Sequence, residues 1–275
     1  MQKNKLNLDP IRLFSDYMQL TGTPSLMPEQ GPDPLLSGKR LGVVNGSSWI
    51  SLWSTYFGAK MLPGVKIINV GNEAVQLHFM EAHHRGAPVP PQQNIDSFGL
   101  YAKELYELYQ VDAILISCST MNRAFPQVQA QMGTYGIPVV QIDEAMMEIA
   151  VNTNGKILVI ATHGPTVQST QALLRETAEK LSRKVDFAGA TIEEAFELLG
   201  KGDIHAHNNL IADTIRKVQA VQSIDVVVLA QLSMSVFSLS YPDPVASFGV
   251  PVLNSGETGF ARAGEVLRGN SGDKK

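Results

Sequence analysis

The sequence predicts an α/β fold of two similar Rossmann-like lobes, each a four-stranded parallel sheet flanked by helices. Short apolar, β-branched runs alternate with longer, more polar stretches of helical character, which is typical of a parallel sheet covered by helices. The runs form two series that correspond in order and at a near-constant offset, which indicates a duplicated unit. Polar residues follow several runs, where such sheets bind ligands.

The expected strands are 40–45, 65–70, 112–117 and 137–142 in the first series, then 156–161, 184–189, 225–230 and 250–255 in the second. The stretch "GKRLGVVNG" from Gly38 resembles "GKILVIATHG" from Gly155. In the third strands, "VDAILISCS" resembles "IDVVVLAQL", with Asp225 following Asp112 by 113 positions. Shared order and offset favour duplication over chance likeness.

The predicted organisation follows from this repeat. Residues 38–151 form the first α/β lobe and 152–255 the second, and a C-terminal helix at 256–268 returns to the first lobe. Residues 1–37 lie outside the repeat as an N-terminal extension and linker. Within them "DPIRLFSDYMQL" has helical spacing, with Asp9 as N-cap and Pro10 in the first turn.

Composition limits the class of protein. The 275 residues carry a net charge of -4 and no basic patch, so nucleic acid is not an expected partner. A single cysteine excludes an internal disulfide. No apolar run reaches the roughly 20 residues of a membrane span, and the first residues lack the apolar core of a signal peptide. We expect a soluble cytoplasmic protein that does not contact membranes.

Polar residues gather where the first and third strands of each series end. In a parallel sheet these ends share one edge, and two similar halves would turn their edges toward a common cleft. The candidate site residues are Asn45, Ser47, Cys118, Ser119, Thr120, Thr162, His163, Gln231 and Ser233.

Cys118 is the candidate reactive group. It ends a strand and is followed by Ser119, Thr120 and an expected helix with Pro126 near its start. A helix N-terminus stabilises a thiolate, which predicts a lowered pKa for Cys118, and its N–H groups with the two hydroxyls suit a carboxylate. The repeat offset places Gln231 opposite Cys118, and an amide side chain cannot act as a base.

Three stretches, "LISCST" at 115–120, "VIATHGPTVQS" at 159–169 and "VVVLAQLSMS" at 226–235, resemble the aspartate/glutamate racemase superfamily. This superfamily includes hydantoin racemases, maleate isomerases and arylmalonate decarboxylases, and the likeness covers roughly residues 38–268. It implies a cofactor-independent enzyme in which two cysteines flank the substrate α-carbon. Cys118 matches the first-lobe cysteine, and Ser119 and Thr120 match the polar pair that holds the substrate carboxylate.

The sequence departs from this pattern at Gln231, which stands where the second cysteine would be. Asn45 matches a polar or acidic position after the first strand, and Thr162 and Thr166 match a threonine pattern in the second lobe. We therefore expect a racemase or isomerase that acts next to a carboxylate of a small acid through Cys118, with His163 as a candidate partner. Asn45, Ser47, Ser119, Thr120, Thr162, Gln231 and Ser233 would bind substrate.

Two alternatives stay open: a decarboxylase of malonate-type acids, and a protein that binds a small carboxylate without catalysis. We expect no metal and no organic cofactor, and a homodimer is the expected assembly. His205 and His207 stand near the start of an amphipathic helical stretch, which favours solvated polar residues over a metal site. Trp49 and Trp53 have the spacing of one helix face, which fits core packing or a cleft wall.

Overall fold

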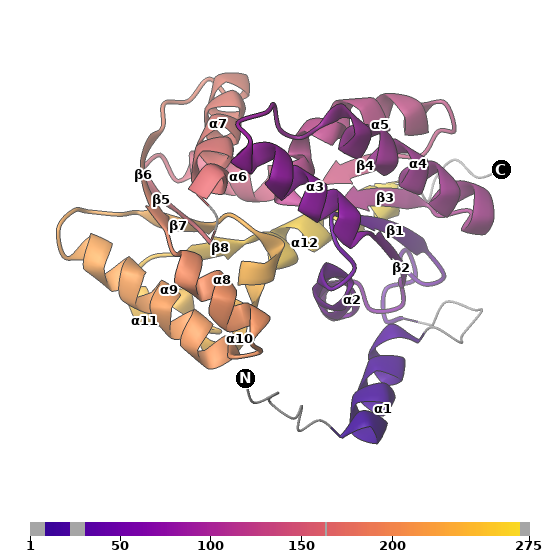
Figure 1. Cartoon of the computed structure of the whole chain (residues 1–275), viewed down its shortest axis with the longest axis horizontal. Helices are drawn as coiled ribbons and strands as arrows, with labels where there is room; N and C mark the ends of the chain where they lie inside the picture. Colours follow the sequence, from indigo (N-terminus) through magenta and orange to yellow (C-terminus); the bar gives the residue numbers. More distant parts are fainter. Residues whose placement is uncertain (1–8, 23–30, 163, 270–275) are drawn as a thin grey trace.

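A computed structural model describes residues 9–22, 31–162 and 164–269, and it places two four-stranded parallel sheets side by side (Figure 1). The first sheet contains β1 (Arg40–Asn45), β2 (Lys66–Gly71), β3 (Ala113–Ile116) and β4 (Val139–Gln141) in the order β2-β1-β3-β4. The second contains β5 (Lys156–Ala161), β6 (Asp186–Thr191), β7 (Val226–Leu229) and β8 (Val252–Asn254) in the order β6-β5-β7-β8. The predicted α/β fold of two similar lobes is confirmed.

Both lobes begin their first strand in the same way. The Asp112 carboxylate accepts a hydrogen bond from the backbone N–H of Arg40 at 2.9 Å. The Asp225 carboxylate accepts one from the backbone N–H of Lys156 at 2.6 Å. The aspartates that match in the repeat therefore hold equivalent neighbouring strands in register, and the duplication extends to this polar contact.

Helices cover both faces of each sheet, because the strands are apolar on both sides. In the first lobe, α2 (Ile50–Met61) and α12 (Ser255–Gly269) cover one face. The other face is covered by α3 (Glu73–His84), α4 (Gln92–Tyr109) and α5 (Phe125–Gly133). In the second lobe, α6 (Glu144–Asn152) and α7 (Gly164–Lys180) cover one face, and α8 (Glu193–Gly200), α9 (Ile204–Gln219), α10 (Phe237–Ser240) and α11 (Pro244–Phe248) lie on the other side.

The lobes exchange one helix each. Helix α12 follows the last strand of the second sheet but packs in the first core through Phe260 and Leu267. Helix α6 follows the last strand of the first sheet but packs in the second core through Met146 and Met147. The predicted boundary at residue 151 assigns α6 to the first lobe, and the structure differs because its buried face lies against β5 and β7.

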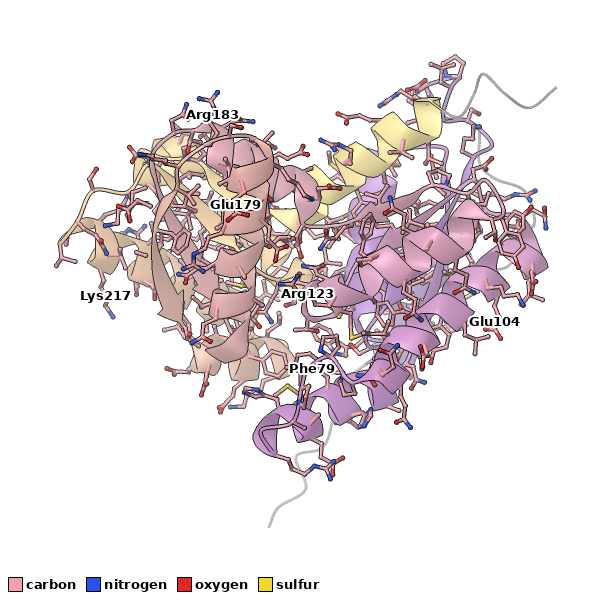
Figure 2. All side chains as sticks on the ribbon, turned by 90° about the horizontal axis from the view of Figure 1, so that it is seen from above. Phe79, Glu104, Arg123, Glu179, Arg183 and Lys217 are labelled. Atoms are coloured by element: carbon pink, nitrogen blue, oxygen red, sulfur yellow. The ribbon has the colours of Figure 1, made fainter. Side chains whose placement is uncertain are left out.

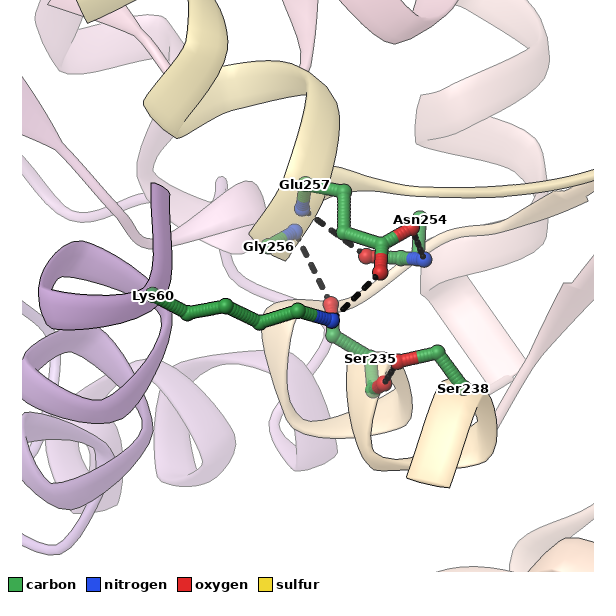
Figure 3. A network of polar contacts seen from close by, with 6 residues as sticks. All are labelled: Lys60, Ser235, Ser238, Asn254, Gly256 and Glu257. Carbon is green, nitrogen blue, oxygen red and sulfur yellow. Dashed lines mark hydrogen bonds and ion pairs between the residues drawn. The ribbon is translucent and has the colours of Figure 1, made fainter. Parts of the chain in front are cut away.

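Polar contacts fix the start of α12 between the lobes (Figure 3). The Gly256 N–H donates to Ser235 Oγ at 2.9 Å, and the Glu257 N–H donates to Asn254 Oδ1 at 2.9 Å. Lys60 on α2 donates to Glu257 Oε1 at 3.1 Å. This network connects α2 of the first lobe to β8 and the segment after β7 of the second lobe.

Helix α1 (Pro10–Thr21) begins as predicted, since the Asp9 side chain accepts hydrogen bonds from the N–H groups of Ile11 and Arg12. It lies apart from both sheets, and none of its residues is buried (Figure 1). None of the helices within the described ranges combines the length and apolar character needed to cross a bilayer.

Candidate active site

A cavity of about 70 Å³ lies where the carboxyl ends of β1, β3 and β7 approach one another. This volume holds only a few water molecules or the end of a small acid. The first lobe contributes Gly46, Ser47, Cys118, Ser119 and Thr120, and the second contributes Phe196, Gln231, Leu232 and Ser233. Among the described residues that line this inner cavity, Cys118 is the only one with a titratable side chain.

Polar groups surround the sulfur of Cys118. Its Sγ lies 3.2 Å from Thr120 Oγ1. The backbone N–H groups of Met121, Thr120 and Gly46 also donate toward it and favour its charged form. The short helix η1 (Ser119–Ala124) directly after Cys118 turns two of these N–H groups back toward the thiol.

Burial nevertheless raises the pKa of the Cys118 thiol, and the hydrogen bonds from Thr120, Met121 and Gly46 offset this only in part. The predicted lowered pKa is therefore wrong. The residue keeps part of its surface open to the cavity, but protein atoms enclose the sulfur. The segment after Cys118 is one irregular 3-10 turn with α5 beginning only at Phe125, so an α-helical dipole does not start at the sulfur.

Gly46 leaves the space that the thiol occupies. A Cβ atom at this position would lie 2.6 Å from Cys118 Sγ. We expect Gly46→Ala to lower the free energy of unfolding by about 1 to 3 kcal/mol, because the side chain and the sulfur cannot share this space. In a Cys118→Ala background the same change should cost much less, which a urea double-mutant cycle measures. An equal cost in both backgrounds would refute this contact.

Gln231 faces the cavity from the second lobe with a defined orientation. Its Oε1 accepts hydrogen bonds from the backbone N–H of Thr162 at 2.7 Å and from Thr162 Oγ1 at 2.8 Å. Two donors on one atom identify it as the amide oxygen, so the amide nitrogen is the end that can donate toward the cavity. On the side of Gln231 the site therefore offers a hydrogen-bond donor but no acid or base that could carry a proton.

The structure brings most of the predicted site residues together, but not all of them. Ser47, Cys118, Ser119, Thr120, Gln231 and Ser233 line the inner cavity. Thr162 does not line the inner cavity, but it donates hydrogen bonds to Gln231 Oε1 and so orients the Gln231 amide. His163 lies outside the described residues.

Asn45 lies behind the cavity wall and is fully buried. Its amide nitrogen donates to Asn69 Oδ1 at 3.1 Å, and its oxygen accepts from Ser54 Oγ at 2.8 Å and from the Ser117 hydroxyl. Since these partners occupy both ends of the amide, Asn45 holds the ends of β1, β2 and β3 together rather than facing a ligand.

A wider groove of about 550 Å³ adjoins the inner cavity. Phe79, Ser119 and Thr120 line both spaces. The Arg123 guanidinium reaches Glu176 on α7 at 2.9 Å and so crosses between the lobes. Figure 2 shows Phe79 and Arg123 near the boundary between the two halves. The groove is therefore an approach to the inner cavity, lined largely by polar side chains.

Sequence reasoning left two groups out of the site. Phe196 on α8 lies edge-on to Trp49 with ring centroids 6.4 Å apart, and both rings line the inner cavity, so Trp49 belongs to the wall rather than to the core.

Asp143 follows β4, is buried, and accepts a hydrogen bond from Asn122 Nδ2 at 2.9 Å. Desolvation by burial raises the pKa of Asp143 to about 6. Its position just after a strand is the sequence feature from which Asp143 could have been predicted as a site residue.

His207 also differs from its prediction. It is buried in α9 and its Nδ1 pairs with Asn208 Oδ1 at 2.8 Å, while His205 is exposed. The sequence pattern placed His207 on the polar face, but its side chain is fully buried. Over the described ranges, no group of three His, Cys, Asp or Glu side chains converges as a metal site would.

Solved structures share this architecture. A glutamate racemase from Francisella tularensis in complex with D-glutamate is 19% identical with a TM-score of 0.60, and the match covers 84% of this chain and 82% of that one. An aspartate racemase homologue from Pyrococcus horikoshii is 18% identical with a TM-score of 0.60, covering 83% and 99%. An allantoin racemase from Klebsiella pneumoniae is 15% identical with a TM-score of 0.54, covering 83% and 82%.

No curated protein sequence matches the chain significantly. The family model described as Asp/Glu/Hydantoin racemase matches residues 93–263, which is more than half of the chain and includes Cys118, Gln231 and Asp143. The solved structures agree with this match in fold. The chain therefore belongs to the Asp/Glu/hydantoin racemase family.

Proposed function

We propose that the protein is a cofactor-independent isomerase of the racemase type that acts at the carbon next to a carboxylate of a small acid. Cys118 is the proposed catalytic residue, and the hydroxyls of Ser119, Thr120 and Ser233 with the Gln231 amide are the proposed carboxylate ligands. The supporting observation is the placement of the lone sulfur on a cavity that both lobes line. Family membership supports the isomerase class.

The raised pKa of the thiol assigns it a direction of proton transfer. A thiol that keeps its proton near neutrality is ready to protonate an enediolate, the anion formed when a proton or CO2 leaves the carbon next to a carboxylate. Hydrogen bonds to the Cys118 sulfur from Thr120 and Gly46 then stabilise the thiolate that remains. The donors around the carboxylate stabilise the enediolate charge.

Gln231 favours a second candidate reaction. Inversion at carbon needs a proton carrier on each face, whereas decarboxylation of a malonate-type acid needs only one proton after CO2 leaves. The Gln231 amide faces the cavity, and its N–H protons are not acidic enough to be transferred to carbon. A malonate-type decarboxylase is therefore the alternative, and a binder without catalysis is the third possibility.

One experiment separates these possibilities. The protein is incubated in D2O with glutamate, aspartate, hydantoins and substituted malonates, and both α-deuteration and CO2 release are followed. Deuterium exchange without CO2 supports the isomerase. CO2 release with deuterium on a single face supports the decarboxylase. Saturable binding with neither reaction would refute both enzymatic proposals.

Replacement of Gln231 by cysteine gives a further prediction. If Cys118 works from one face only, Gln231→Cys places a thiol on the opposite side of the cavity and should make the product at least about tenfold less stereochemically pure, since either face can then be protonated. Chiral chromatography of the product measures this. Gln231→Ser, which cannot donate a proton as readily, is the matched control and should keep the wild-type ratio.

The size of the site limits the substrate. The inner cavity holds the carboxylate and the reacting carbon, and any larger substituent has room only in the adjoining groove past Ser119 and Thr120. Acids with a polar substituent fit the side chains there. The homodimer and the cytoplasmic location remain predictions.

A further inference from the structure

Asp143 is a buried carboxyl beside the active site that the proposed chemistry does not use. It stands between β4 and α6, at the point where the chain leaves the first sheet. Its Oδ2 accepts a hydrogen bond from Asn122 Nδ2 at 2.9 Å. Its side chain lies behind the site, since Asp143 lines neither the inner cavity nor the groove.

Two hydroxyls face this carboxyl from different lobes. Ser119 and Ser255 lie close enough to favour its charged form. Nevertheless, within the described part of the chain, Ser119 Oγ, Ser255 Oγ and Asp143 Oδ1 all lack a hydrogen bond of good geometry. Buried polar atoms rarely stay unpaired, so this group is poised to pair when its surroundings change.

Ser119 connects the carboxyl to the cavity. It follows Cys118 directly and lines both the inner cavity and the groove. A serine hydroxyl has one proton to donate. If the Asp143 carboxylate is ionised, Ser119 donates to it and turns its lone pairs toward the cavity, where they repel an anion. If Asp143 is protonated, it donates to Ser119 Oγ, and the Ser119 proton is free to bind a carboxylate.

We propose that Asp143 is a positioning residue for Ser119, and that it takes up one proton from solvent when a carboxylate binds beside Cys118. This inference deepens the proposed function and rests on it, because it assumes that the site receives a carboxylate. Asp143 touches neither the substrate nor the reacting atoms, and it acts only through the direction of the Ser119 hydroxyl.

The surroundings of Asp143 allow this proton uptake. The pKa of Asp143 is raised to about 6, because desolvation by burial outweighs the opposing contacts with Asn122, Ser119 and Ser255. Among the described residues no cation forms an ion pair with it: on the adjoining elements Arg123 pairs with Glu176, Arg262 with Glu148, and Lys60 with Glu257. The other titratable groups on those elements are Tyr56, Glu144, Glu265 and Arg268, which pairs with Asp33, and Cys118 directly precedes η1.

Alkylation of the thiol provides a test that needs no known substrate. Cys118 is the only cysteine in the chain, so all alkylation of a thiol occurs at this residue. Iodoacetate and iodoacetamide differ by a carboxylate and react with the same thiolate. The ratio of their rates therefore cancels the ionisation of the thiol and isolates recognition of the carboxylate. Both rates are measured by mass spectrometry from pH 5 to pH 8.

We expect the ratio in the wild type to rise about tenfold from pH 7.5 to pH 5, as Asp143 gains its proton. In Asp143→Asn the ratio should be high at every pH, because the amide can always donate to Ser119. In Ser119→Ala it should be low at every pH. Asp96→Asn removes an exposed carboxyl on α4 and should keep the wild-type profile.

Each other outcome contradicts a separate step. A wild-type ratio that exceeds that of free cysteine but does not change with pH overturns the role of Asp143 and leaves the carboxylate site intact. A pH dependence that persists in Ser119→Ala indicates repulsion by the Asp143 charge and overturns positioning through Ser119. A ratio no higher than that of free cysteine in all variants overturns both this inference and the proposed carboxylate site.

Discussion

Cys118→Ser is expected to lower the rate of proton exchange at the substrate carbon by about a thousandfold or more. A positioned acid or base contributes about 10² to 10⁴ in rate, and Cys118 is the only titratable group among the described residues that line the inner cavity. A serine hydroxyl holds its proton far more tightly than a thiol does, so it cannot take over this step. Deuterium incorporation from D2O, followed by NMR, measures the loss.

The comparison requires that the variant keeps its fold. Serine is slightly smaller than cysteine, and its hydroxyl can still pair with Thr120, so the free energy of unfolding in urea should stay close to that of the wild type. Cys118→Ala serves as a second variant that has no donor at all. Exchange that continues in both variants at more than a tenth of the wild-type rate would rule out Cys118 as the proton carrier.

Asp143→Asn is expected to raise the free energy of unfolding by about 3 kcal/mol at pH 8. The pKa of Asp143 rises from 3.8 to about 6 because burial disfavours the charged carboxylate. Relative to the unfolded chain, Asp143 therefore destabilises the fold increasingly as the pH rises from its unfolded to its folded pKa, and each unit of difference between these pKa values corresponds to about 1.4 kcal/mol. The uncharged amide lacks this cost and can keep the contact with Asn122.

The pH dependence distinguishes this effect from an ordinary change in packing. The difference between variant and wild type should vanish near pH 4, increase between pH 4 and 6, and stay constant above pH 7. Effects of His207, whose pKa is lowered by burial, are common to both proteins and cancel. Asp96→Asn is the control, because hydrogen bonds from Gln127 and Gln92 lower the pKa of this exposed group. A gain equal at pH 4 and pH 8 would contradict the argument.

Stability and carboxylate recognition are both expected to increase in Asp143→Asn, because the charge that weakens the fold also turns the Ser119 hydroxyl away from the cavity. The same charge that weakens the fold above pH 6 allows the carboxyl to exchange a proton as the site fills. A buried ionisable group that costs stability is a common property of functional sites.

The sequence predicts the fold well because its main signals are local. Strand runs such as 40–45 and 156–161 are apolar on both faces, and the structure has β1 and β5 over those residues. The repeat adds the prediction that the chain forms two lobes with equivalent sheets. The partner of α6 could not be predicted, because an apolar face such as that of Met146 and Met147 says that a helix is buried but not against which of two similar sheets.

The site is predictable only in part, for the same reason. Position after a strand finds Cys118, Ser119 and Gln231, and all three line the cavity. The pKa of Cys118 depends on how many protein atoms enclose the sulfur, which no spacing reveals. The direction in which the Gln231 amide points depends on Thr162, 69 positions away, and is settled only by the folded contact.

The exchange of α6 and α12 has a consequence for biosynthesis. The core beneath the first sheet contains Phe260, Ala263 and Leu267, which are synthesised after all the strands of both sheets. While the other half is being translated, this face of the first sheet is therefore covered by α2 alone, although domains usually fold in the order in which they emerge. Premature termination before α12 would damage the half that was made first.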